Sequence, residues 1–347
     1  MQINPIAIRS AQRLAAACAV LSQTTLPVHI SRANTPAVIV VTSAADSGPA
    51  TLRQAILDAN AAPGPDTIQF AIGTGGASGI VTLTLASELP TLSDAITLDA
   101  TTQPGYTRTP QIVLDGRATR GASGLTFGGP LTATAGSVVK GLAIVGFENI
   151  GINLSGAGPY TVQDNVIGLD SAGQVALPNR LRGIYLAGSN SLIQGNLIVG
   201  DVGQTALFVA GDANAIVSNT IGTDRTATRP LGGTAFGILV GGSRNRLQGN
   251  GVSGNFSGVY LSEPANDTTL ENNTFSRNNG SGLVINSSAN RITANTIALN
   301  GLAGISVQAG HGNTMRANAI YSNTALGIDL DPAGLPNPND DLDADDG

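Results

Sequence analysis

The chain has 347 residues, with 45 glycines and 41% hydrophobic residues, but only 12% charged and 3% aromatic residues and no tryptophan. This composition argues against a globular enzyme with an aromatic core and favours many short strands and tight turns lined by small side chains. The formal net charge is −6 and no basic stripe occurs, so nucleic acid and anionic membrane surfaces are not expected as partners.

The first 33 residues have the pattern of an export signal. Arg9 and Arg13 precede the apolar run 14–21, which is too short to span a bilayer. We therefore expect a secreted or cell-surface protein, the alternative being an unstructured start, and no transmembrane segment follows. This region also holds the single cysteine and one of the two histidines, so a mature chain would keep only His311 and could form no disulfide or multi-histidine zinc site.

The segment 34–95 precedes the repeats, and within it lies a helix signal. Thr51 and Gln54 form a capping-box pattern. An apolar face follows at helical spacing, made of Leu52, Ala55, Ile56 and Ala59. A solenoid needs its open end covered, because a free strand edge recruits other chains. The sequence therefore predicts a short N-terminal capping helix.

From residue 151 onward one strand pattern recurs, with a small residue, an apolar residue, a variable residue and a second apolar residue. Its copies begin at Gly151, Gly183, Ala206, Gly237, Gly258, Gly282, Gly304 and Gly327. Five of the seven intervals are 21 to 24 residues, which suits one turn of a three-sided solenoid. The two apolar residues of each copy share one face, which can be buried only by stacking on neighbouring copies. The pattern predicts an all-β, right-handed parallel β-helix over 96–330, with a leucine-rich horseshoe as the competing fold.

Asparagines recur with the same period and mark the turns. One column is Asn165, Asn196, Asn219, Asn250, Asn273, Asn295 and Asn318, and a second is Asn190, Asn214, Asn245, Asn290 and Asn313. Asparagine tolerates left-handed backbone, bonds to nearby main chain and can form ladders between stacked coils. We therefore expect structural ladders here in preference to ligand contacts.

Two intervals are longer because each carries an insertion at the same corner, 167–179 and 221–233, named here the first and second insertions. They lie two coils apart, so we expect them side by side, roughly 10 Å from each other. The candidate catalytic residues at this corner are Asp170, Asp224, Arg182 and Arg225, with Arg180 and Arg229 as further partners. Such a group could perform acid–base chemistry or recognise an acidic sugar. A structural role in the turns is the favoured alternative, because aspartate bonds to turn backbone.

The variable position of each copy points outward and places apolar side chains in a row. This outer row consists of Tyr185, Phe208, Leu239, Tyr260 and Val284. It should cross five coils over roughly 20 Å. Contiguous exposed apolar surface marks a partner, a ligand groove or a covering segment, and sugars stack on aromatic rings. Tyr185, Phe208, Leu239 and Tyr260 are the candidate substrate-binding residues. Alternatively, the insertions fold over the row, or a homotrimer forms through it.

The segment 41–60 resembles the N-terminal module of bacterial surface β-helix proteins that carry a Cys-Ser-Leu-Arg-Glu-Ala signature. Here the corresponding stretch is Ala50-Thr51-Leu52-Arg53-Gln54-Ala55, and residues 99–106 and 221–224 also resemble that group. The resemblance implies the pectate-lyase-like β-helix class, which includes lyases, epimerases, hydrolases, adhesins and phage tail proteins. It therefore implies an architecture and leaves the activity open.

Pectate-lyase-like enzymes hold Ca²⁺ between clustered carboxylates on an outer sheet, beside an arginine or lysine base. The outer row carries no such cluster. A possible Ca²⁺ site lies in the acidic segment 331–347, where Asp341, Asp343 and Asp345 alternate, although the glycine spacing departs from that of an EF-hand. A solvated tail or a linker to sequence beyond Gly347 is the favoured alternative.

Two functions fit these features. The first is a secreted or cell-surface protein that presents a non-catalytic binding face to polysaccharide or other surface glycans. The alternative is a polysaccharide lyase, epimerase or hydrolase that acts on acidic polysaccharide at the paired insertions. The polymer, and the choice between monomer and homotrimer, stay open.

Overall fold

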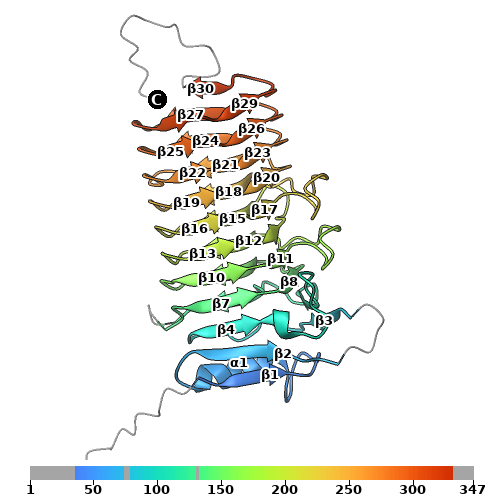
Figure 1. The fold of residues 1–347 in the computed structure, drawn as a ribbon. Coiled ribbons are helices and arrows are strands. Elements are labelled where there is room, and N and C mark those ends of the chain that lie inside the picture. Colours follow the sequence, from blue (N-terminus) through green and yellow to red (C-terminus); the bar gives the residue numbers. More distant parts are fainter. Residues whose placement is uncertain (1–35, 74–78, 130–132, 331–347) are drawn as a thin grey trace, which may run out of the picture. The chain divides into compact units, whose positions relative to one another are not determined.

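The computed structural model describes residues 36–73, 79–129 and 133–330 as a right-handed parallel β-helix (Figure 1). Successive coils each add a strand to three parallel sheets, named A, B and C. The fold predicted from the repeat is confirmed. The competing horseshoe is wrong, because strands of all three sheets recur through the repeat and no helix alternates with them in residues 133–330.

The described strands divide among the sheets as follows. Sheet A contains β1 (Val38–Val41), β2 (Asp66–Phe70), β4 (Ile96–Asp99), β7 (Ser137–Lys140), β10 (Tyr160–Gln163), β13 (Leu192–Gln194), β16 (Ala215–Val217), β19 (Arg246–Gln248), β22 (Thr269–Glu271), β25 (Arg291–Thr293) and β28 (Thr314–Arg316). Sheet B contains β3 (Val81–Thr84), β5 (Ile112–Asp115), β8 (Leu142–Val145), β11 (Val166–Ile167), β14 (Leu197–Ile198), β17 (Thr220–Ile221), β20 (Gly251–Ser253), β23 (Thr274–Ser276), β26 (Thr296–Ala298) and β29 (Ala319–Tyr321). Sheet C contains β6 (Leu125–Phe127), β9 (Ile150–Leu154), β12 (Arg182–Leu186), β15 (Thr205–Val209), β18 (Phe236–Val240), β21 (Ser257–Leu261), β24 (Leu283–Asn286), β27 (Ile305–Ala309) and β30 (Ile328–Leu330).

The apolar pairs of the repeat fill the interior of the stack. Ile184, Leu207 and Ile238 pair in register along sheet C and are fully buried, as predicted. Burying one such side chain is worth about 1.5–3 kcal/mol, and each coil shelters the next. Gly183 opens its copy because a Cβ there would lie 2.6 Å from the Ala206 carbonyl oxygen of the next coil. The repeat therefore combines large inward side chains with a position where the coils meet backbone to backbone.

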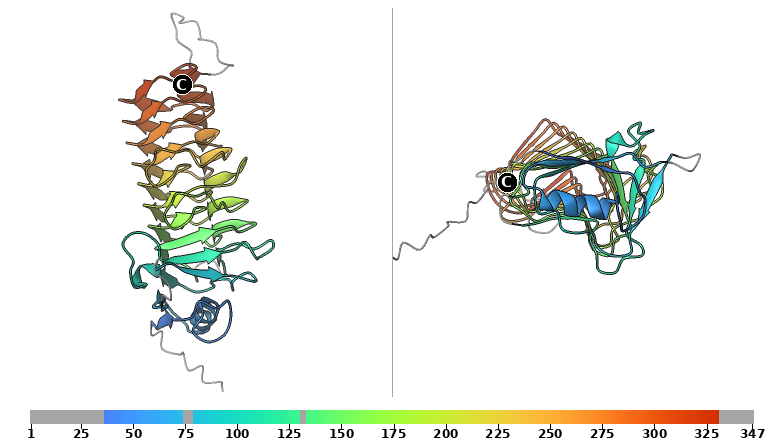
Figure 2. Two further views of the ribbon diagram at one scale, coloured as in Figure 1. Left: turned by 90° about the vertical axis from the view of Figure 1, so that its right-hand side faces the viewer. Right: turned by 90° about the horizontal axis from the view of Figure 1, so that it is seen from below.

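Helix α1 (Leu52–Ala61) covers the N-terminal end of the stack, and the view along the axis shows it lying across that end (Figure 2). The Thr51 hydroxyl accepts a hydrogen bond from the Gln54 N–H at 3.3 Å, and the predicted apolar face is buried. A short 3-10 helix, η2 (Ala100–Thr102), follows β4. Strands β1, β2 and β3 also belong to the sheets, so the stack extends into the segment 34–95.

The asparagine columns form ladders, with one correction. In the first column each Nδ2 donates to the Oδ1 of the next asparagine at 2.9–3.0 Å, from Asn165 to Asn318. In the second column the assignment of Asn190 was wrong. Its neighbour Ser191 holds the column position in that coil, and Asn190 has a left-handed φ of 57°, like Ala213. A third ladder was missed, and it runs through Asn255, Asn278, Asn300 and Asn323.

Candidate functional site

The three outer faces differ in chemistry. Sheet A is polar and carries exposed or half-buried ion pairs such as Arg246–Glu271 at 3.4 Å. Sheet B is covered from β5 to β14, because Leu169 and Leu177 of the first insertion pack with its outward side chains in a separate apolar cluster. The insertions therefore pack on this part of sheet B, and the alternative that they fold over the outer row is wrong. Of the three outer faces in the described part of the chain, that of sheet C carries the outer row, whose aromatic side chains are half-buried.

The outer row is aligned as the sequence predicted. Tyr185 pairs with Phe208, Phe208 with Leu239, Leu239 with Tyr260, and Tyr260 with Val284. The first four side chains are half-buried, and Val284 is buried. Parallel, in-register strands hold the Cα atoms of the row at the coil spacing, and the packed interior fixes the sheet beneath. The row is therefore a rigid strip along the stack.

Aromatic contacts tie the row together. The rings of Tyr185 and Phe208 lie 5.4 Å apart, centroid to centroid, with their planes tilted by 52°. A second pair, Phe236 and Tyr260, lies 4.8 Å apart at 38°. Phe236 was missed in the sequence because it stands before the repeat glycine, where neighbouring coils have Thr205 and Ser257. The site therefore contains one more ring than the periodic pattern indicates.

Arg182 belongs to this face and not to the acid–base group predicted for it. Its guanidinium carbon lies 5.5 Å from the Tyr185 centroid and 5.2 Å from the Phe208 centroid. A guanidinium over aromatic rings is a stabilising cation–π arrangement that also leaves hydrogen-bond donors at the edge. Arg182 therefore adds one positive charge to the aromatic strip.

Amide side chains flank the row at both ends. Asn286 donates from Nδ2 to the Tyr260 hydroxyl at 2.6 Å, and Asn153 pairs with Tyr185 in register. The Oδ1 atoms of both asparagines are shielded from solvent and have no hydrogen-bond partner among the described residues. Unsatisfied acceptors of this kind are uncommon in folded proteins. The outer row is thus flanked by amide groups, of which the Asn286 amide is bonded to the Tyr260 hydroxyl.

The two loop aspartates serve their own turns. Asp170 accepts bonds from the backbone N–H groups of Gln174 and Val175 at 2.6 and 2.8 Å. Asp224 does the same for Thr228 and Arg229 at 3.1 and 3.2 Å. Within residues 133–330 no ion pair joins either aspartate to the candidate arginines, and both carboxylates bond to the backbone of their own turns.

Hydrogen bonding also governs the ionisation of Asp224. Burial by itself would raise the pKa of this carboxyl group. The backbone N–H of Arg229, the Thr226 hydroxyl and the Thr228 N–H outweigh that effect, and the pKa lies below its ordinary value. Asp224 is therefore a stable carboxylate near neutral pH, which suits a turn anchor better than a proton donor.

Arg225 joins the two insertions. Its Nε donates to the Ala172 carbonyl at 3.0 Å, and its Nη2 to the Ser171 carbonyl at 3.2 Å. The backbone N–H of Arg225 also donates to the Gly173 carbonyl at 2.9 Å. The insertions, which were expected to lie side by side, are thus bonded directly to each other, and Arg225 is a connector between them.

The predicted metal residues cannot be placed. Asp341, Asp343 and Asp345 lie outside the described residues, as do the predicted export signal 1–33 and Cys18. Within the described ranges, no three histidine, cysteine, aspartate or glutamate side chains gather as metal ligands. His311 is exposed, and its Nδ1 lies 3.4 Å from the Ser288 hydroxyl. No helix in the described part of the chain is both long and apolar enough to cross a bilayer.

Comparisons with known proteins agree with this architecture. A family model described as a right handed beta helix region matches residues 177–320. The A-module of mannuronan C-5 epimerase AlgE6 from Azotobacter vinelandii is similar with a TM-score of 0.58 and 14% identity, over 83% of this chain and 77% of that chain. No curated protein matches the sequence.

Further solved structures give lower scores. The A-module of mannuronan C-5 epimerase AlgE4 from the same organism has a TM-score of 0.47 and 16% identity, covering 85% of this chain and 97% of that one. Pectate lyase Pel9A has a TM-score of 0.40 and 17% identity, covering 80% and 70%. The family match and the AlgE6 module show that the chain has the right-handed parallel β-helix fold.

Proposed function

We propose that this chain is an exported, non-catalytic β-helix protein that binds glycan chains along the outer row of sheet C. The observation that carries the proposal is the in-register alignment of Tyr185, Phe208, Leu239 and Tyr260 on a face that the insertions leave free. Sugar rings bury their C–H faces on aromatic rings, and their hydroxyl groups need donors and acceptors at the edges. The outer row supplies the aromatic rings, and the polar groups beside it supply hydrogen bonds.

The polar groups beside the outer row also favour a glycan as the ligand. The Arg182 guanidinium and the Tyr260 hydroxyl can bond to sugar hydroxyl groups. A polysaccharide running along the stack would meet similar side chains at each coil. Binding by such a strip depends on many modest contacts, so we expect affinity to rise with the length of the oligosaccharide.

The hydrogen bonds that Asp170, Asp224 and Arg225 form in the insertions support a non-catalytic role. Asp170 and Asp224 each accept two backbone bonds on Oδ1, and Arg225 is engaged with carbonyl groups of the first insertion. A general acid or base must be free to reach the substrate proton. These three side chains already hold the insertions in place, which favours a structural role for them.

The test is oligosaccharide binding by the full chain, first on a glycan array and then by calorimetry. Tyr185→Ala and Tyr260→Ala should each weaken binding by about tenfold, because losing a stacked ring costs on the order of 1–2 kcal/mol. Tyr321→Ala is the matched control, since Tyr321 is an exposed tyrosine on β29 of sheet B. Equal affinities for all four proteins would refute the outer row as the site.

The alternative function is a lyase or epimerase for acidic polysaccharide. Incubating the protein with uronate polymers, with and without Ca²⁺, separates the two functions. An increase in ultraviolet absorbance from unsaturated products, lost in Asp224→Ala and Arg225→Ala, would establish a lyase at the insertions. Our proposal expects binding without product.

Export and surface display form part of this proposal. The leader pattern in 1–33 and the resemblance of 41–60 to the module of bacterial surface β-helix proteins support them. Helix α1 gives that module a physical role as the cover of the solenoid end. Fractionation of cells that express the full chain should place it outside the cytoplasm, and recovery of uncleaved protein from the cytoplasm alone would contradict export.

A further inference from the structure

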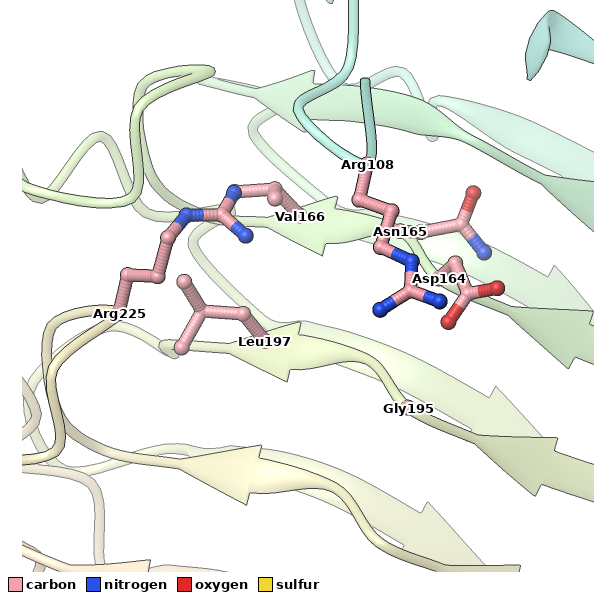
Figure 3. A pocket seen from close by; sticks show the side chains of 7 residues that line it. All are labelled: Arg108, Asp164, Asn165, Val166, Gly195, Leu197 and Arg225. Carbon is pink, nitrogen blue, oxygen red and sulfur yellow. The ribbon is translucent and has the colours of Figure 1, made fainter. Parts of the chain in front are cut away.

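A pocket of about 180 Å³ opens on the outer face of sheet B, beside the turn that leads from sheet A (Figure 3). Val166 of β11 and Leu197 of β14 form its apolar floor, and Arg108, Asp164 and Arg225 stand around it. The two arginines are 117 positions apart in the sequence and approach from opposite sides. Periodicity could not predict this pocket, because neither arginine belongs to the repeat.

Arg108 has a free guanidinium group. Its side chain is exposed and makes no hydrogen bond or ion pair with any other residue in the described ranges. Its backbone has a left-handed φ of 67°, which costs free energy for a residue with a Cβ. No bond of the turn uses the positive charge among the described residues, and Figure 3 shows the guanidinium end of the side chain turned toward Asp164.

Arg225 is oriented by the first insertion. Two of its nitrogens donate to the carbonyl groups of Ser171 and Ala172, which fixes the plane of the guanidinium group beside the pocket. A guanidinium has five N–H donors, so others stay available for a ligand. The second insertion thus supplies the cation, and the first insertion holds it in place.

Asp164 supplies the one carboxylate of the pocket lining. Its Oδ2 accepts a bond from Gln163 Nε2 at 3.1 Å. Gly195 lies beside it on the next coil, where a Cβ would come within 2.6 Å of Asp164 Oδ1 and the φ of 66° is left-handed. The lining therefore carries two positive charges and one negative charge, an excess of one.

Tyr106 lies near the same charges. Burial raises the pKa of its hydroxyl group, with further raising effects from Asp164 and Asp99 and opposing effects from Arg225 and Arg108. The hydroxyl therefore stays protonated at neutral pH. It can act as a neutral hydrogen-bond donor close to the pocket.

We infer that this pocket binds the singly charged oxyanion group of an acidic sugar, with Arg108 and Arg225 on the anion. Arginine recognises oxyanions by charge-assisted, planar hydrogen bonds. The excess of one positive charge matches one carboxylate or one sulfate ester. This site lies on sheet B, so it goes beyond the glycan strip proposed on sheet C.

The experiment compares tetragalacturonate with its fully methyl-esterified form, by calorimetry on the full chain. The acid should bind more tightly than the ester, and Arg108→Gln should remove that difference by weakening the acid about tenfold or more. Asp164→Asn should strengthen binding of the acid, because it removes a like charge. Arg277→Gln is the matched control, since Arg277 is also exposed and has a left-handed φ of 52°.

A sulfated tetrasaccharide identifies the anion. Tighter binding of the sulfated sugar than of tetragalacturonate, again lost in Arg108→Gln, would assign the pocket to sulfate esters, and the reverse order would assign it to carboxylates. Equal binding of acid and ester, or an acid preference unchanged in Arg108→Gln, would overturn the inference. Tyr185→Ala distinguishes the two sites, because it should weaken acid and ester alike and leave their ratio unchanged.

Discussion

Each asparagine of the first ladder supports three coils at once. Asn273 donates from Nδ2 to the Leu247 carbonyl and to Asn295 Oδ1, both at 2.9 Å, and accepts from the backbone and side chain of Asn250. The side chain is buried, so water cannot replace these bonds. The ladder therefore makes each turn depend on the turns above and below it.

Asn273→Ala should lower the free energy of unfolding by on the order of 3 kcal/mol, because it leaves buried donors and acceptors on two neighbouring coils unpaired. Urea unfolding followed by circular dichroism measures the effect. The control is Asn272→Ala at the adjacent exposed position, where the next coil already has Ala294 with the same left-handed backbone. Similar midpoints for the two variants would contradict the role of the ladder.

Asp224 makes the second insertion sensitive to acid. Its folded-state pKa lies below the ordinary value, so its contribution to stability is fully present above the pKa of the unfolded chain. The contribution is lost as the pH falls through the folded-state pKa. Carboxyl-carbon NMR should give a titration midpoint below that of a peptide of residues 221–233. A midpoint at or above the peptide value would show that the backbone bonds do not act as described.

At the level of elements, the N-terminal cover is fastened by one arginine. Arg53 of α1 forms an ion pair with Asp46 at 2.7 Å and donates to the carbonyl groups of Ser87 and Glu88. Its side chain is only 16% exposed, so these bonds are largely protected from water. The helix is thereby joined to the segments before and after it.

Arg53→Ala should lower the free energy of unfolding by roughly 2–3 kcal/mol, through the loss of several charge-assisted bonds. The change should also increase proteolysis around α1 before the rest of the stack opens, because a solenoid can open from its end. Arg120→Ala is the control, since Arg120 is exposed. Equal thermal midpoints for the two variants would contradict the role of Arg53.

The sequence predicted correctly the residues whose positions depend on the period of the strand repeat. The strand period placed Ile184, Leu207 and Ile238 in one interior column and Tyr185 and Phe208 in one outer row. It could not place contacts that depend on loop paths. Arg182 stacks on aromatic rings and forms no ion pair with an aspartate in the described residues. Arg225 and Arg108 both line the sheet B pocket. Asn190 was misplaced because Ser191 replaces the asparagine of its column in that coil.

At the scale of the whole described solenoid, function follows from the different use of three faces. Sheet A is polar, sheet B is covered from β5 to β14 by the first insertion and has an arginine-lined pocket, and sheet C carries the outer row with its aromatic rings. Because the coils stack in register, any side chain repeated on one face becomes a continuous surface along the axis. The glycan chain that we propose as the ligand would run along such a surface.

A crystal structure of the protein with a bound neutral oligosaccharide tests the central proposal most directly. We expect sugar rings packed on Tyr185, Phe208 and Tyr260, with the chain running from coil to coil along sheet C. An oligosaccharide bound only on sheet A, or only beside the insertions, would contradict the proposal.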